Sequence, residues 1–438
     1  MESLGDWSLS SLKAARIKNS ARSLSLSYEN TTPLLPIRAC GSKIFSLDNG
    51  KDEVGYLDTR NNVPHVGHNH PVVVKAAAAQ LAQMNTNSRY LHPAHVNLTN
   101  RLLSTFPASM NASEDFVVFL VNSGSEANDL AVRLAQANWQ HKNPVGFSRG
   151  ESGEIICVDR AYHGNTQATV GLSPYKWGPN DRFKPHNVTK VACPSPYHDS
   201  SGVRSTGQDF AKEVEAVCTA KSVAGFIVES GMSVAGVILP PEGYLKHCYD
   251  HVRKVGGVTI ADEVQTGFGR FGEHFWGFEQ QGVEPDIITM GKPFGNGLPL
   301  AACVCRRSIS DKFDEAGIEY FNTFGGNLVS CAAGAAVLDV IEGEGLMRNA
   351  RDVGKHLKDG FEKMSSAGTL VGDVRGMGLF IGVELVIGGD AMKPATKQTS
   401  RLCSILKVSS FLSANHCGDT LLFSQRRRRA CCRTSTTF

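Results

Sequence analysis

The sequence lacks long apolar runs, paired cysteine motifs and a strong charge of one sign. Because no run of about 18 apolar residues occurs, it predicts no membrane-spanning helix. The 12 cysteines include no Cys-x-x-Cys pair, so we expect reduced thiols of a cytoplasmic protein rather than zinc ligands or disulfides. A formal net charge of +3 is too small to indicate nucleic acid or a membrane surface as the main partner.

The sequence also offers little evidence of a targeting signal, a nucleic-acid patch or a metal site. The N-terminal segment has no apolar core, which argues against a secretory signal and leaves a mitochondrial transit peptide as the alternative to a cytoplasmic location. The basic run Arg426–Arg429 is interpreted as a solvated tail rather than a nucleic-acid patch. His65, His68 and His70 are loosely spaced, and no cluster of carboxylates or thiolates accompanies them, so we predict no metal site.

The middle of the chain, from about 70 to 330, alternates apolar strands with helices. This order predicts a mostly parallel sheet with helices on both faces. Several strands are nearly continuous apolar runs, as expected when both faces are buried. The expected strands are 116–121, 154–158, 224–229, 258–261, 286–290 and 300–304. The expected helices are 125–139, 209–220, 243–255 and 328–342.

The predicted fold class is therefore α/β, with a large domain and a smaller α+β domain. We place the N-terminal arm and part of the small domain at 1–69, the large domain at 70–335 and the rest of the small domain at 336–400. Residues 401–438 lack a clear periodicity, and we treat them as an atypical tail.

Two segments that follow predicted strands suit a phosphate and a flat ring. In 122–129, NSGSEAND, Ser125 can cap a helix, and Gly124 lets backbone amides at the helix N-terminus approach an anion. Tyr162 and His163 come just after the strand 154–158, where a ring can stack on a heterocycle. Taken alone, a plain helix cap and a partly buried structural tyrosine are the better interpretations.

Two further segments carry a carboxylate and a lysine. Asp262 ends an apolar strand, where a buried carboxylate needs a partner such as a cationic ring nitrogen. Lys292 follows the strand 286–290, and a desolvated lysine can act as an amine nucleophile and base. The alternatives are a helix N-cap for Asp262 and an exposed loop lysine for Lys292.

Together the four segments bring a phosphate cradle, a stacking ring, a carboxylate and an amine to one sheet edge. This is the set that pyridoxal 5'-phosphate (PLP) requires: a phosphate anchor, a ring contact, a pyridinium partner and a Schiff-base lysine.

These motifs, with TFGGN at 323–327, resemble the class III (ω-amino acid) aminotransferases, which are PLP enzymes of fold type I. The resemblance covers roughly residues 30–390. It implies that Lys292 forms the Schiff base, that Asp262 pairs with the ring nitrogen and that Tyr162 stacks on the ring. The remaining implied cofactor-site residues are Gly124, Ser125, His163, Glu229, Gln265 and Thr323, with Thr323 acting in the partner subunit of a homodimer or dimer of dimers.

Arg375, in VRGMGLFIGVEL, matches the arginine that receives substrate carboxylates in this family. Three segments, 60–71, 85–92 and 291–299, resemble the ethanolamine-phosphate and 5-phosphohydroxylysine phospho-lyases. Arg89, which lies in the segment 85–92, is a second candidate for binding the substrate. The sequence departs from the family at Ser230 and at Leu328, each of which stands in place of a usual proline, and at 401–438, which does not resemble the family's C-terminal segment.

The resemblance implies three alternative functions. A phospho-lyase would eliminate phosphate from a phosphorylated amine. An ω-aminotransferase would pass the amino group to a 2-oxo acid. A non-catalytic PLP-binding protein is the third alternative, because the C-terminal segment is unusual.

Overall fold

The computed structural model describes residues 9–19, 34–48, 52–199, 202–317, 319–366, 370–412, 414–416 and 420–423. The arginine run predicted to form a solvated tail lies outside these described residues. None of the described helices is both long and apolar enough to cross a bilayer.

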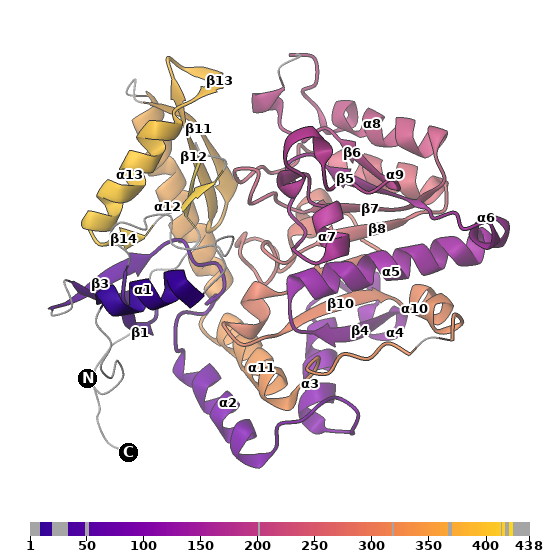
Figure 1. Cartoon of the computed structure of the whole chain (residues 1–438), viewed down its shortest axis with the longest axis horizontal. Coiled ribbons are helices and arrows are strands. Elements are labelled where there is room, and N and C mark those ends of the chain that lie inside the picture. Colours follow the sequence, from indigo (N-terminus) through magenta and orange to yellow (C-terminus); the bar gives the residue numbers. More distant parts are fainter. Residues whose placement is uncertain are drawn as a thin grey trace.

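A seven-stranded sheet forms the centre of the molecule (Figure 1). Its strand order is β4-β10-β9-β8-β7-β5-β6. Neighbouring strands from β9 to β6 are parallel, whereas β10 is antiparallel to both β4 and β9. The strands are β4 (Phe116–Val121), β5 (Glu154–Val158), β6 (Val188–Val191), β7 (Val223–Glu229), β8 (Val258–Asp262), β9 (Ile287–Met290) and β10 (Ala301–Arg306). The predicted α/β fold with a mostly parallel sheet is confirmed, while β6 and the direction of β10 were not predicted.

Helices cover both faces of this sheet because both sets of alternating side chains are apolar. On β5, Ile156 and Val158 join one buried cluster and Ile155 and Cys157 join the other. The first cluster includes residues of α8 (Gly207–Ala220), α9 (Tyr244–Lys254) and α11 (Leu328–Gly343). The second includes residues of α5 (Gly124–Lys142) and α10 (Arg307–Asp314). Further helices are α2 (Pro71–Gln83), α3 (Pro93–Leu103), α4 (Ala112–Asp115), α6 (Pro144–Ser148) and α7 (Gln167–Gly171).

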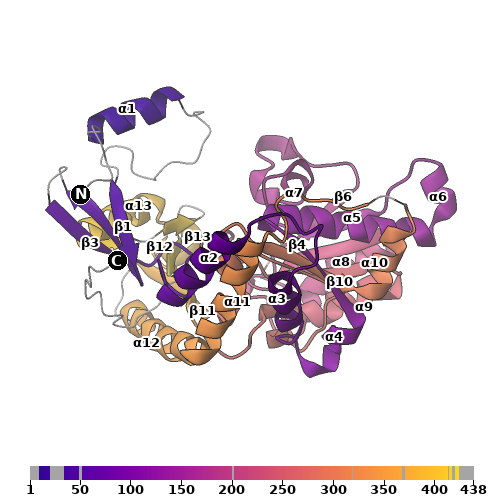
Figure 2. The ribbon, with the colours of Figure 1, turned by 90° about the horizontal axis from the view of Figure 1, so that it is seen from below.

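The two ends of the described chain meet beside the large sheet (Figures 1 and 2). A four-stranded sheet has the order β1-β2-β3-β14, in which the C-terminal β14 pairs in parallel with β3. A second sheet has the order β11-β12-β16-β15, and β13 pairs with β12. Its strands are β11 (Val371–Met377), β12 (Phe380–Ile387), β13 (Asp390–Pro394), β15 (Ala414–His416) and β16 (Thr420–Phe423). The other elements are α1 (Leu9–Asn19), β1 (Pro36–Cys40), β2 (Lys43–Asp48), β3 (Asp52–Asp58), α12 (Leu346–Ser366), α13 (Thr396–Val408) and β14 (Phe411–Leu412).

Candidate active site

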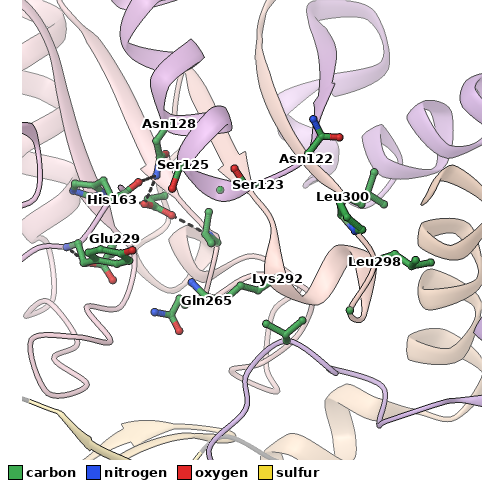
Figure 3. A pocket seen from close by; sticks show the side chains of 18 residues that line it. Asn122, Ser123, Ser125, Asn128, His163, Glu229, Gln265, Lys292, Leu298 and Leu300 are labelled. Atoms are coloured by element: carbon green, nitrogen blue, oxygen red, sulfur yellow. Dashed lines mark hydrogen bonds and ion pairs between the residues drawn. The ribbon is translucent and has the colours of Figure 1, made fainter. Parts of the chain in front are cut away.

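A cavity of about 400 Å³ lies where the carboxyl ends of β4, β5, β7, β8 and β9 meet (Figure 3). Ligands of open α/β sheets bind at this edge. Of the residues predicted for the cofactor, the structure brings eight together around the cavity and leaves Thr323 outside it. The eight are Gly124, Ser125, Tyr162, His163, Glu229, Asp262, Gln265 and Lys292.

The first turn of α5 provides an anion cradle. The Gly124 and Ser125 amides occupy its first two positions, where a helix offers no internal acceptor. A side chain at position 124 does not fit, because a Cβ there would lie 2.8 Å from both Cγ atoms of Val264. The prediction that Ser125 caps the helix is wrong, since the Ser123 side chain accepts from the Glu126 amide at 3.2 Å. Ser125 Oγ instead accepts a hydrogen bond from the Asn165 amide at 3.1 Å.

The glycine before Lys292 lies against this cradle. A Cβ on Gly291 would lie 3.2 Å from the Gly124 amide nitrogen, which is a tight contact, so glycine at 291 favours the close approach of this segment to the start of α5. Lys292 has a positive φ of 22° at the start of a short 3-10 turn, and its side chain extends toward Gln265 (Figure 3). Burial lowers the pKa of Lys292, and the Asp262 and Glu229 carboxylates oppose this effect. The lowered pKa favours the neutral amine that a nucleophile or base requires.

Asp262 is buried and fixed by three donors. Its Oδ2 accepts from Asn128 Nδ2 and from His163 Nδ1, each at 2.8 Å, and its Oδ1 accepts from the Val264 amide at 3.0 Å. Asn128 is itself fixed, because its Oδ1 accepts from Thr289 Oγ1 at 2.6 Å. These bonds leave the carboxylate oriented at the cavity wall with acceptor capacity for one more donor.

Asn128 was not assigned a role from the sequence. It follows Gly124 by about one helical turn, and this spacing puts both residues on the cavity side of α5. This spacing is the sequence feature from which the position of Asn128 at the cavity could have been predicted. Val264 was also missed, and its contact with position 124 depends on two segments that are distant in sequence.

Glu229 is buried at the end of β7 and supports the backbone of Tyr162. Its Oε1 accepts from the Tyr162 amide at 3.0 Å, and its Oε2 accepts from the Ser233 amide at 3.2 Å. The Tyr162 ring is half-buried at the cavity. Burial raises the pKa of Glu229 from 4.5 to about 7, although His163 acts in the opposite direction. Both charge states of Glu229 are therefore populated near neutral pH.

We expect Glu229→Gln to remove part of the pH dependence of stability. The Glu229 pKa is higher in the folded chain than in the unfolded chain, so the folded chain holds the proton more tightly. The free energy of unfolding should therefore fall as the pH rises from about 4.5 to about 7, by about 3 kcal/mol from this group. Urea unfolding of cofactor-free protein at about pH 5 and about pH 8 measures the difference. The same pH difference in wild type and variant would contradict this assignment.

The departure at Ser230 has a local explanation. The Ser230 hydroxyl donates to Glu263 Oε1 at 2.5 Å. Glu263 is fully buried and also accepts from the Thr266 hydroxyl and from the Gly277 and Phe278 amides. Serine at 230 therefore supplies one of four donors to a buried carboxyl group, which proline could not do.

The predicted substrate arginines do not line the cavity. The Arg375 guanidinium forms 2.6 Å ion pairs with Asp373 and with Glu384, and its Nε donates to the Gly236 carbonyl at 2.9 Å. Arg89 is exposed, with its guanidinium carbon 4.3 Å from the centre of the Phe321 ring.

Thr323, predicted to serve the partner subunit, is also exposed. Its neighbour Asn322 accepts a 2.8 Å hydrogen bond from the cavity residue Asn122. The loop that carries Thr323 is thus attached to the rim of the cavity in its own chain.

The cavity fits PLP in four respects. The cradle at Gly124 has room for an anion, and Asp262 can accept from a protonated ring nitrogen. His163 Nε2 is a buried polar atom without a hydrogen-bond partner among the described residues, so the polar wall is not fully satisfied by the chain itself. Lys292 supplies an amine at the same cavity.

The class III aminotransferase family model matches residues 27–407, most of the chain. The protein belongs to this family. It is therefore a PLP-dependent enzyme of fold type I, a lyase or a transaminase, that acts on a small-molecule amine.

Similar proteins within the family include some named as aminotransferases and some named as phospho-lyases. The chain is 43% identical over 372 residues to an alanine–glyoxylate aminotransferase 2-like protein of Drosophila melanogaster, with 82% of this chain and 71% of the relative covered. It is 34% identical over 389 residues to an ethanolamine-phosphate phospho-lyase homolog of Caenorhabditis elegans, with 84% and 79% covered. Among solved structures, a phospholyase from Arthrobacter in complex with phosphoethanolamine has a TM-score of 0.81 at 32% identity, with 94% of each chain covered.

Proposed function

We propose that the protein is a PLP-dependent phospho-lyase that releases phosphate from O-phosphoethanolamine or 5-phosphohydroxylysine and yields an aldehyde and ammonia. The similarity to the Arthrobacter phospholyase bound to phosphoethanolamine carries this proposal, because it extends over 94% of both chains. The cavity around Lys292 and Asp262 supports it, since it combines an amine, a fixed carboxylate and an anion cradle.

The chain's own residues would perform the proton transfers. When bound, PLP supplies an electron sink that makes the carbon bearing the substrate nitrogen acidic. Lys292 would hold the cofactor covalently and, once displaced by the substrate amine, would take the proton from that carbon with Nζ. Asp262 would keep the ring nitrogen protonated, and the Gly124 and Ser125 amides would hold the cofactor phosphate.

In the elimination, the carbon–hydrogen bond would break, its proton would go to Lys292 Nζ and its electron pair would form a carbon–carbon double bond. The carbon–oxygen bond to phosphate would break, and the phosphate would leave with the electron pair of that bond. Water completes the reaction by hydrolysing the remaining product to ammonia and the aldehyde. Loss of phosphate requires no 2-oxo acid.

An ω-aminotransferase is the second candidate, and the 43% identical Drosophila relative favours it. The same lysine and aspartate would serve amino transfer, so the catalytic residues do not separate the two reactions.

The deciding assay is the incubation of PLP-loaded protein with phosphoethanolamine and no oxo acid. We expect phosphate, ammonia and acetaldehyde in equal amounts. Transfer of the amino group to an added oxo acid with phosphate retained would favour the transaminase. Cofactor uptake with neither reaction would contradict both candidates.

We also propose a homodimer in which Thr323 of each chain completes the cofactor site of the other. Its exposure on a loop attached to the cavity rim supports this arrangement. Lys292→Ala and Thr323→Ala chains should each be impaired alone, whereas a mixture exchanged into heterodimers should regain one intact site of two. Sedimentation gives the subunit number, and a fully active monomer or an exchanged mixture no more active than its parents would refute the shared site.

The domain limits at 69, 335 and 400 and the cytoplasmic location, with the mitochondrion as the alternative, stay predictions. The described residues after 400 contribute the second part of α13 and the strands β14, β15 and β16.

A further inference from the structure

Arg375 presents no net positive charge to an incoming anion. Asp373 and Glu384 are directly opposite each other across β11 and β12, a placement that is unfavourable for like charges unless a cation lies between them. Arg375 fills that position, and His198 Nε2 contacts the other oxygen of Glu384 at 2.9 Å. The single positive charge of the Arg375 guanidinium is thus balanced by two carboxylates. A substrate phosphate would therefore need another cation.

A lysine lies beside the Tyr162 ring, which lines the cavity, whereas Lys176 is itself exposed and neither it nor Arg160 lines the cavity. Lys176 Nζ is 5.8 Å from the centre of the Tyr162 ring and 5.2 Å from that of Tyr175. The two rings meet edge to face, with their centres 6.5 Å apart. Within the described ranges, no carboxylate lies within 4.0 Å of Lys176 Nζ, so its charge is not neutralised by an ion pair.

An arginine precedes Tyr162 by two residues and has a strained backbone. Arg160 has a φ of 64°, in the left-handed region that a residue with a side chain seldom adopts. Such strain concentrates at functional sites. The neighbouring Asp159 pairs with Lys190 at 3.5 Å. Arg160 forms no ion pair with any part of the chain that the structure describes.

We propose that Lys176 and Arg160 bind the phosphate group of the substrate on the Tyr162 side of the cavity and set the preference for phosphorylated amines. Two cations match the charge of a phosphate dianion, and charge-assisted hydrogen bonds to phosphate are about twice as strong as neutral ones. Lysine is a mobile point charge and arginine is a planar fork, and both bind phosphate in proteins. The inference deepens the proposed function and rests on it for the reaction, but the binding preference can be measured separately.

The competing interpretation is an ordinary surface contact between a cation and an aromatic ring. Lys184 makes such a contact, with Nζ 5.9 Å from the centre of the Trp177 ring. Trp177 is buried and does not line the cavity. Lys184→Gln is therefore a matched control for Lys176→Gln.

Arg160→Gly separates lost binding from lost folding. Glycine adopts a left-handed backbone freely, so the variant removes the guanidinium while it relieves the strain. We expect its Tm to equal or exceed that of the wild type. A weaker affinity for phosphate in this variant therefore cannot be attributed to unfolding.

The test titrates each PLP-loaded protein with O-phosphoethanolamine and with ethanolamine and follows the absorbance of the bound cofactor. Lys176→Gln and Arg160→Gly should each weaken binding of the phosphorylated amine about tenfold or more, as expected for a lost hydrogen bond to a charged group. Both should leave ethanolamine affinity within about twofold, and Lys184→Gln should change neither affinity.

The outcomes also distinguish the inference from the proposed function. If the wild type prefers the phosphorylated amine and both variants keep that preference, the inference is wrong even where phosphate is released. A wild type that binds the two amines equally well also overturns it. If the preference exists and the variants lose it, the inference holds, and absence of phosphate release would then count only against the lyase reaction.

Discussion

Replacing Asp262 by asparagine should lower the rate of the proton-removal step by several orders of magnitude while the chain stays folded. An opposite charge at contact shifts a pKa by roughly one to three units, and each tenfold in rate corresponds to about 1.4 kcal/mol. The amide cannot hold the ring nitrogen protonated. It is nearly the same size, and its oxygen can still accept from Asn128 and His163, so most of the local contacts remain.

One contact should be lost, because the new NH₂ group would face the Val264 amide, which donates to Asp262 Oδ1 at 3.0 Å. Single-turnover kinetics with phosphoethanolamine measures the rate, and circular dichroism with Tm measures folding. Asp286→Asn is the control, since Asp286 is a buried carboxylate paired with Arg253 and Arg306 away from the cavity. It should reduce stability with little effect on the rate. Activity of Asp262→Asn within a few-fold of wild type would show that Asp262 is only a structural acceptor.

Replacing Lys292 by alanine should abolish covalent attachment of the cofactor and lower the turnover about a thousandfold or more. A positioned general base contributes typically 10²–10⁴-fold. The variant removes that base and the amine whose pKa is lowered by burial. The alanine side chain leaves space at the cavity, so a small added amine such as methylamine should restore part of the rate.

Lys292→Arg is the matched control for this variant. It keeps the positive charge and most of the side-chain volume, but a guanidinium is neither a nucleophile nor a base at neutral pH. It should be as inactive as the alanine variant and should not respond to methylamine. Turnover close to wild type in either variant would assign the catalytic amine to another residue.

The central strands could be predicted because each is a short apolar run that ends in a polar motif. Val158 and Val121 are fully buried, and the segments that follow them carry Tyr162 and Gly124 to the same edge. Parallel strands place their carboxyl ends together, so the order of the strands was enough to predict that Gly124, Tyr162, Asp262 and Lys292 meet, whereas Glu229 and Gln265 were predicted from the family resemblance. The strand β10 was predicted at 300–304 but its antiparallel direction was not, since an apolar run has the same appearance in either direction.

Contacts that depend on register or on distant segments could not be predicted. Arg375 was expected to be available to substrate, but its charge is shared because the β11–β12 register sets Asp373 opposite Glu384. Ser123, and not Ser125, caps the helix because its side chain reaches the Glu126 amide three residues later. Ser123 and Ser125 belong to one Ser-Gly-Ser sequence, and capping propensity alone does not choose between two serines.

The most direct test of the account is to identify the residue that carries the cofactor. Holoenzyme reduced with borohydride fixes PLP to its lysine, and mass spectrometry of the peptides locates it. We predict a single adduct on Lys292, lost in Lys292→Ala. An adduct on any other lysine, with Lys292 unmodified, would contradict the assignment of this cavity as the active site.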